Sequence, residues 1–285
     1  MSVIFSFGEI LWDIFPDYKK PGGSPANLAY HLHVLGNKSY LVSRIGEDKH
    51  GEELLKFISE KGLSTQYVQK DARQPTGTVT VHFSGDEPSY TIHKPAAWDY
   101  IEMSDELKSA MTDADAICFA SLSQREEKSA NTLQNILDTI PENCLKVFDL
   151  NLRPPFTNQD IILTTIEKAN VVKFNKDELD MVSDWLDVEN LPAYLLRHDP
   201  AKKILLTLGG DGSALFTKKG YFEHQAYPIS GEGDFVGVGD AFLACITHLL
   251  LKGEEGENLL RKANRYAAAV ASQKGGMPGM DQIST

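Results

Sequence analysis

Short apolar runs alternate with longer amphipathic segments along most of the chain, and this alternation constrains the fold more than any other feature. Several runs are apolar on both faces, as parallel strands buried between two layers of helices must be. Two of the amphipathic segments, 25–35 and 51–61, are each followed by a glycine that can end a helix. The pattern predicts an α/β fold with a doubly wound, mostly parallel central sheet flanked by helices. The expected strands cover residues 3–7, 40–44, 116–119, 146–148, 171–174 and 204–207.

A second, smaller sheet is predicted outside this pattern. Its strands alternate polar and apolar side chains, and a Gly-Asp-Glu-Pro turn separates two of them. We expect a small antiparallel β lid formed by residues 11–20 and 75–100, within a single domain that covers residues 1–285. Such a lid can cover a site or join two copies into a homodimer, and a plain surface hairpin is the alternative. The expected lid strands and turn cover residues 11–15, 77–83, 85–88 and 90–93.

Composition narrows the class of protein. Hydrophobic residues make up 42% and charged residues 24%, which excludes a disordered or fibrous chain. The formal net charge is −12 with no basic run, so we expect neither nucleic acid nor a membrane as a partner. The N-terminal stretch lacks a basic leader and is interrupted by Gly8, Glu9 and Asp13, so we expect a cytoplasmic protein. The cysteines are too scattered for a disulfide framework or a zinc motif, and we expect buried free thiols at Cys118, Cys144 and Cys245.

The strongest chemical signal is a glycine-rich turn that enters an apolar stretch at 242–251, which we expect to be a buried helix. The backbone N–H groups of Gly237, Val238 and Gly239 would lie unpaired at the start of this helix and form an anion hole. Asp240 follows directly and places a carboxylate beside that hole. A general base that accepts a hydroxyl proton during phosphoryl transfer explains this arrangement, and a favourable first-turn acid is the alternative.

Other polar clusters occur where a ligand is expected. Asn27 follows a glycine turn, Asp13 lies where the first strand passes into the lid, and both side chains can bind sugar hydroxyls. Each is also a common cap or turn residue. Three more clusters, 149–154, 175–178 and 209–212, directly follow predicted strands. Ligands of open parallel sheets bind beyond the carboxyl ends of the strands, so we expect these clusters to lie at one edge.

These residues resemble the ribokinase-like, phosphofructokinase-B-type carbohydrate kinases over essentially the whole chain. Gly22-Gly23-x-x-x-Asn27 matches the N-terminal signature of that family. Residues 46–51 match its G-x-D-x-x-G element, and residues 234–240 match its C-terminal signature. The resemblance implies a ribokinase-like fold and the use of ATP and Mg²⁺.

The resemblance also implies a role for each matching residue. Asp240 is the implied catalytic base, and the implied anion hole consists of Gly237, Val238 and Gly239. The implied substrate-binding residues are Asp13, Gly23, Asn27 and Arg153, the last of them near the phosphates. The implied nucleotide-binding residues are Asn175, Glu178, Thr207, Gly209 and Gly212. Glu178 would hold magnesium through water, and Asp234 and Val236 would hold a monovalent cation such as K⁺, because the charge of Asp234 would otherwise lie unpaired near bound phosphates.

Residues 8–13, 23–27 and 149–154 are closer to fructokinases than to ribokinases or adenosine kinases. This likeness implies ATP-dependent transfer of the γ-phosphate to a primary hydroxyl of a hexose, with fructose the favoured sugar. A 2-keto-3-deoxygluconate kinase is one alternative, with Lys94 on the lid as the basic partner of the substrate carboxylate, and another sugar or nucleoside kinase is a second. A non-catalytic sugar-binding sensor is an alternative from another class, because Phe235 and Val238 replace smaller residues of the family signature.

Overall fold

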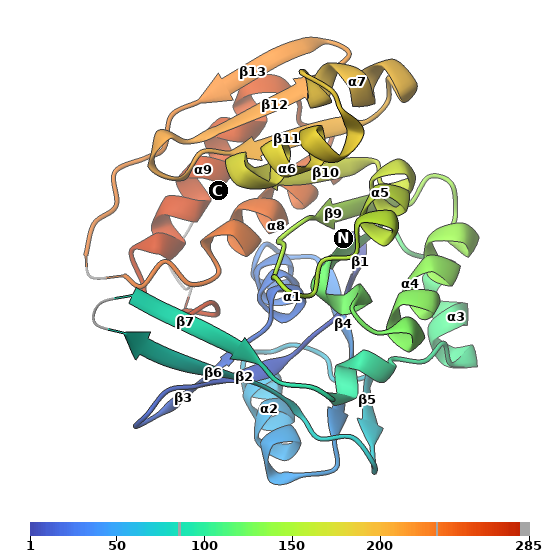
Figure 1. The fold of residues 1–285 in the computed structure, drawn as a ribbon, viewed down its shortest axis with the longest axis vertical. Helices are drawn as coiled ribbons and strands as arrows, with labels where there is room; N and C mark the ends of the chain where they lie inside the picture. Colours follow the sequence, from blue (N-terminus) through green and yellow to red (C-terminus); the bar gives the residue numbers. More distant parts are fainter. Residues whose placement is uncertain (85–86, 232, 280–285) are drawn as a thin grey trace.

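The central sheet has nine strands in the order β13-β12-β11-β10-β9-β8-β1-β4-β5 (Figure 1). The computed structural model describes residues 1–84, 87–231 and 233–279. In this order, neighbouring strands from β11 through β5 pair in parallel, and β12 and β13 add an antiparallel edge. The predicted doubly wound, mostly parallel sheet is therefore confirmed. The strands are β1 Val3–Phe7, β4 Lys38–Gly46, β5 Val68–Asp71, β8 Ala116–Ala120, β9 Leu145–Asp149, β10 Val171–Asn175, β11 Lys203–Thr207, β12 Ser213–Thr217 and β13 Gly220–His224.

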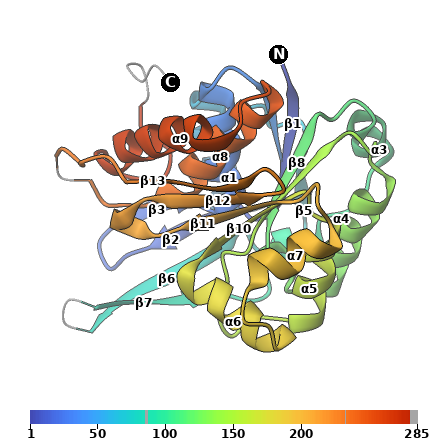
Figure 2. The same ribbon diagram turned by 90° about the horizontal axis from the view of Figure 1, so that it is seen from above.

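Helices cover both faces of this sheet (Figure 2). Successive residues of β1 point to opposite faces, so Ile4 joins one buried core and Phe5 joins the other. The first core is shared with α1 Ser24–Val34, α2 Lys49–Glu60, α8 Val238–Leu251 and α9 Gly256–Ala271. The second is shared with α3 Asp105–Met111, α4 Glu127–Thr139, α5 Gln159–Lys168, α6 Lys176–Leu186 and α7 Leu191–His198. Short 3-10 turns occur at η1 Ala97–Tyr100, η2 Leu122–Gln124 and η3 Gly209–Asp211.

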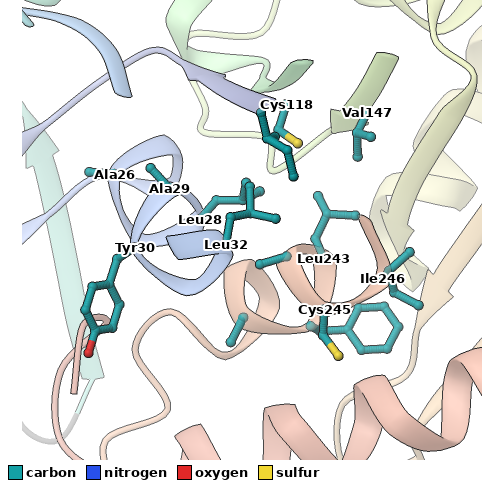
Figure 3. Packing of buried hydrophobic residues seen from close by; sticks show 14 of the residues in the cluster. Ala26, Leu28, Ala29, Tyr30, Leu32, Cys118, Val147, Leu243, Cys245 and Ile246 are labelled. Atoms are coloured by element: carbon teal, nitrogen blue, oxygen red, sulfur yellow. The ribbon is translucent and has the colours of Figure 1, made fainter. Parts of the chain in front are cut away.

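Helices α1 and α8 pack together against the middle of the sheet, on the same face as α9, although the sequence between them is long. Figure 3 shows Leu28 and Leu32 of α1 facing Leu243 of α8, with Cys118 of β8 above them. The thiols of Cys118, Cys144 and Cys245 are buried and free, as predicted, and burial raises the pKa of each to about 12. No helix in the described part of the chain is long and apolar enough to cross a membrane.

The lid is a separate four-stranded sheet in the order β3-β2-β6-β7, and its β6–β7 hairpin extends away from the central sheet (Figures 1 and 2). Its pairs are antiparallel except β2 with β6, which run parallel. Of the expected turn at 85–88, residues 85 and 86 lie outside the described residues, and Glu87 already belongs to β7. The bounds are β2 Leu11–Ile14, β3 Lys19–Gly22, β6 Gly77–Ser84 and β7 Glu87–Ile92.

Two helices begin earlier in the chain than expected from the sequence. Helix α8 begins at Val238 instead of 242, because Gly237 adopts the left-handed conformation, with a φ of 73°, and ends the preceding loop. Helix α2 begins at Lys49 instead of 51, because the carboxylate of Asp48 accepts a hydrogen bond from the Gly51 amide at 2.8 Å. The G-x-D-x-x-G element is thus a helix cap in this structure.

The order of the strands fixes where a ligand can bind. The chain leaves β1 through the lid and α1 to β4 on one side, and it later returns to β8 on the other side of β1. The connections diverge at the carboxyl end of β1, which leaves a crevice there.

Candidate active site

A cleft of about 580 Å³ opens beyond the carboxyl end of β1, between the lid and the N-terminus of α8. Its charged and amide side chains are Glu9, Asp13, Asn27, Asp149, Asn151, Arg153, Lys173, Asp234 and Asp240. It brings together ten of the residues singled out from the sequence: Asp13, Gly23, Asn27, Arg153, Asp234, Val236, Gly237, Val238, Gly239 and Asp240. A volume of this size suits a small molecule rather than a macromolecule.

The N-terminus of α8 forms one wall of the cleft. The N-cap residue Gly237 provides no side-chain cap, so the first N–H groups of the helix remain available to a ligand. A Cβ on Gly237 would lie 2.7 Å from the Cα of Gly276, so no larger residue fits this turn. A Cβ on Gly239 would lie 3.7 Å from Nζ of Lys173, which places an ammonium group beside the same helix end. The positive end of the helix dipole and Lys173 together favour an anion here.

Asp240 lies in the first turn of α8 and is 8% exposed. Ser24 Oγ donates to one carboxylate oxygen at 2.6 Å, and Asn27 Nδ2 donates to the other at 2.8 Å. Burial raises the pKa of Asp240 to about 6, although both hydrogen bonds and Lys173 act to lower it. The carboxylate is therefore fixed in position and ionised at neutral pH, as a general base must be.

Lys173 is a buried cation in the otherwise apolar strand β10. Its Nζ donates to Asp149 Oδ1 at 2.7 Å, and both side chains are less than 10% exposed. Burial alone would lower the pKa of Lys173, but the carboxylates of Asp149, Glu178 and Asp240 raise it above its ordinary value. The ammonium group therefore keeps its charge at the floor of the cleft.

Asp13 and Glu9 contribute two further carboxyl groups to the cleft. Burial raises the pKa of Asp13 to about 6, against the opposing effects of Arg153 and Lys20. Burial, with a smaller contribution from the Asp240 carboxylate, raises the pKa of Glu9 to about 7. Both acids thus differ from ordinary surface carboxylates, and groups with shifted pKa values gather at functional sites.

Asn175 and Glu178 form a capping box at the start of α6 and do not line the cleft. Asn175 Oδ1 accepts from the Glu178 amide, and the Glu178 carboxylate accepts from the amides of Asn175 and Leu152 at 2.8 and 2.9 Å. Glu178 therefore holds the loop that carries Arg153. The described residues contain no cluster of three His, Cys, Asp or Glu side chains that could hold a metal directly.

Thr207, Gly209 and Gly212 lie at the end of β11, next to Asn175 of β10 and outside the lining of the cleft. Gly212 has a φ of 105°, and a Cβ there would lie 2.2 Å from the carbonyl oxygen of His224. Only glycine fits at position 212, because the backbone at the end of β13 lies so close to it. The backbone of this turn remains open to solvent at Gly209, which is exposed.

Asp234 has a partner that the sequence did not indicate. Lys20 Nζ donates to its Oδ2 at 2.9 Å, and the Gly275 amide donates to its Oδ1 at 2.9 Å. Asp234 therefore has a counter-charge without a bound K⁺, contrary to the expectation that its charge would otherwise lie unpaired. Val236 contributes its amide, at 3.3 Å from Asp234 Oδ1, and Phe235 stands 62% exposed with a φ of 58°.

The structure also corrects the role considered for Lys94. Its Nζ pairs with Glu126, and the side chain lines a different cavity beside Arg125 and Phe156. The basic side chains that reach the cleft are Arg153 and Lys173. Lys173 was not among the residues expected from the sequence, although a lysine within an apolar strand is a signal that a buried carboxylate lies nearby.

The fold and the cleft together define the class of this protein: it is a ribokinase-like kinase. Residues 17–283 match the family described as pfkB family carbohydrate kinase. The chain belongs to this family, and it is an ATP-dependent carbohydrate kinase.

Similar proteins agree with this membership. A fructokinase of Vibrio alginolyticus is 28% identical over 98% of this chain and 96% of its own. A crystal structure of an uncharacterized sugar kinase from Pyrococcus horikoshii is 26% identical, with a TM-score of 0.82 over 97% of this chain and 93% of that one. The structure of a fructokinase from Xylella fastidiosa with bound ATP has a TM-score of 0.86 at 22% identity, over 96% of this chain and 94% of that one.

Proposed function

We propose that the protein phosphorylates a primary hydroxyl of fructose, with ATP as the donor. The observation that carries the proposal is the position of the Asp240 carboxylate, which Ser24 and Asn27 hold at the open N-terminus of α8 beside Lys173. Fructose as the acceptor is supported by relatives named fructokinase, 26% identical in Solanum tuberosum and 28% in Vibrio alginolyticus. A structural neighbour, the fructokinase of Vibrio cholerae, is described in a form with fructose, ADP and potassium bound.

In this proposal the sugar lies between Asp13 and Asn27, and its hydroxyl faces Asp240. The hydroxyl oxygen attacks the γ-phosphorus, its proton passes to the Asp240 carboxylate, and ADP leaves with the electrons of the broken P–O bond. The N–H groups of α8 and the ammonium of Lys173 stabilise the charge on the transferring phosphoryl group. Arg153 lies near the phosphates, and the nucleotide extends towards Asn175, Thr207, Gly209 and Gly212 at the ends of β10 and β11.

Magnesium would supply charge neutralisation on the phosphates of ATP. Both oxygens of Glu178 already accept backbone hydrogen bonds, and in this proposal the carboxylate acts on the metal through water. The described residues offer no direct metal cage, and the proposed magnesium therefore binds chiefly to the nucleotide.

A coupled assay of ADP release over a panel of sugars tests the proposal. Fructose should give the highest kcat/KM, and 2-keto-3-deoxygluconate, ribose and adenosine should give lower values. If turnover is highest with 2-keto-3-deoxygluconate, that compound and not fructose is the acceptor. Sugar binding in calorimetry without ADP release from any sugar would support the sensor and overturn the kinase assignment of the cleft.

We propose that two copies of the protein associate through their lids. The lid has two edge strands, β3 and β7, each of which pairs with one lid strand and leaves its outer edge unpaired in the described part of the chain. Edge strands of this kind favour pairing with another chain. Light scattering that gives a monomer at assay concentrations would contradict the association.

A further inference from the structure

Glu9 is a buried carboxyl group that the proposed transfer does not use. It lies two residues after the end of β1, is 2% exposed, and lines the cleft with Asp13 and Asp240. The amides of Glu9 itself and of Ser24 bind its carboxyl group, but its Oε2 has no hydrogen-bond partner. A buried polar atom without a partner is unfavourable, and it therefore needs a reason, such as a ligand that the atom binds.

The neighbourhood of Oε2 suits a sugar. Asn27 Oδ1 is a second buried oxygen of the cleft without a partner, although Asn27 Nδ2 donates to Asp240. Both side chains line the cleft with Asp240, Glu9 from the loop after β1 and Asn27 from α1. A ligand that offers several hydroxyl groups satisfies both atoms, whereas a purely apolar ligand satisfies neither.

We propose that Glu9 binds the acceptor sugar as a neutral carboxylic acid, with its Oε2–H donating a hydrogen bond to a sugar oxygen beside the hydroxyl that is phosphorylated. The proposal rests on the proposed function and adds a specificity-determining residue to it. Asp13 and Asp240 accept hydrogen bonds from the sugar, and Glu9 supplies a donor from the same floor.

The charges around Glu9 agree with a neutral acid. Asp240 of α8 faces it and opposes a second negative charge, whereas Arg153, in the loop after β9, favours one. Asp13 of β2 and the Lys173–Asp149 pair line the same cleft. Burial is the largest effect and raises the pKa of Glu9 to about 7, above the value of about 6 for Asp240. Between these values Glu9 keeps its proton while Asp240 has lost its own, so one group donates and the other accepts.

The test is the pH dependence of kcat/KM for the sugar in the wild-type kinase and in Glu9→Gln. We expect a bell-shaped profile for the wild type, with an acid limb from Asp240 and an alkaline limb near pH 7 from Glu9. The amide of Gln donates a hydrogen bond at every pH, so Glu9→Gln should keep the acid limb and lose the alkaline one. An alkaline limb unchanged in Glu9→Gln would overturn the proposal, because a merely structural carboxyl would not set this limb.

Glu9→Met removes the donor at similar volume. The KM for the sugar should rise about tenfold or more, because the sugar oxygen is left unpaired, while the KM for ATP stays within about twofold. An unchanged sugar KM would also overturn the proposal, and the Gln variant decides the question if Glu9→Met does not fold.

The matched control is Asp115→Asn, which changes a carboxyl that binds the Val3 amide away from the cleft and should leave the pH profile unchanged. If the wild type turns over no sugar, the proposed function itself fails, which is a different result from an active enzyme insensitive to position 9.

Discussion

Asp240 is the residue on which the proposed chemistry depends. Asp240→Asn keeps the shape and one acceptor of the side chain but cannot take the hydroxyl proton. We expect kcat to fall by about two to four orders of magnitude, which is the usual effect of losing a positioned base. Calorimetry should show sugar and nucleotide binding close to those of the parent. A turnover within a few-fold of the parent would show that Asp240 is only a first-turn acid of α8.

At the scale of single residues, the sequence predicts groups whose neighbours in the chain explain them. Gly237 and Asp240 lie next to the start of the helix that they serve, so their spacing in the sequence predicted their role. The roles of other residues depend on partners far away in the chain, as that of Lys20 depends on the Asp234 carboxylate. Glu9 and Lys173 are two more such residues. Such pairings depend on the strand order, which spacing alone does not supply.

Strands β9 and β10 are joined across their side chains by the pair between Lys173 and Asp149. Lys173→Met would leave the Asp149 carboxylate buried without a counter-charge. We expect the free energy of unfolding to fall by about 3–5 kcal/mol, measured by urea denaturation at pH 7. The control Lys168→Met removes a more exposed pair with Asp138 and should cost less than about 1 kcal/mol. Equal losses in the two variants would mean that burial does not govern the strength of the Lys173 pair.

Strand β3 of the lid is connected to the loop before α8 by the ion pair between Lys20 and Asp234. The ammonium group supplies the positive charge that a bound monovalent cation would supply. We expect the wild type to have the same turnover in potassium as in a bulky organic cation at constant ionic strength. Lys20→Met leaves Asp234 without its cation, and potassium should then increase turnover. Strong potassium activation of the wild type would contradict this prediction.

The elements themselves were predicted well where burial on both faces dictates them. Residues 3–7 and 171–174 are apolar except for Ser6 and Lys173, and they form β1 and most of β10. The start of α8 was placed four residues late, because Val238 and Gly239 are poor helix formers and only the conformation of Gly237 shows where the turn ends. The parallel pairing of β2 with β6 was not predictable, because β3, α1, β4, α2 and β5 separate these two strands in the chain.

At the scale of the whole molecule, three carboxyl groups with raised pKa values lie in one cleft. Glu9, Asp13 and Asp240 bind protons more tightly in the folded protein, at pKa values of about 7, 6 and 6, than in the unfolded chain. Between about pH 4 and pH 7 the unfolded state thus carries fewer protons, and the free energy of unfolding falls as the pH rises.

The size of this effect is measurable through Glu9. The proton on Glu9 contributes about 3 kcal/mol to the free energy of unfolding at low pH, because its pKa is near 7 in the folded state against an ordinary value of 4.5. This contribution is fully lost above pH 7. Urea denaturation at pH 5 and pH 8 should therefore show a larger decrease for the wild type than for Glu9→Gln. Identical pH dependence of the two proteins would show that Glu9 titrates alike in the folded and unfolded states.

The packing of α1 against α8 affects how the protein is made in the cell. A ribosome completes Asn27 and the apolar face of α1 early, but Asp240 and the covering residues of α8 emerge only near the end of synthesis. Until then the nascent chain exposes Leu28 and Leu32, which chaperones would bind, and it lacks the base of the cleft. A transcript truncated before Val238 therefore encodes a chain without activity, and two separately expressed halves divided at an exposed loop would regain activity only when they associate.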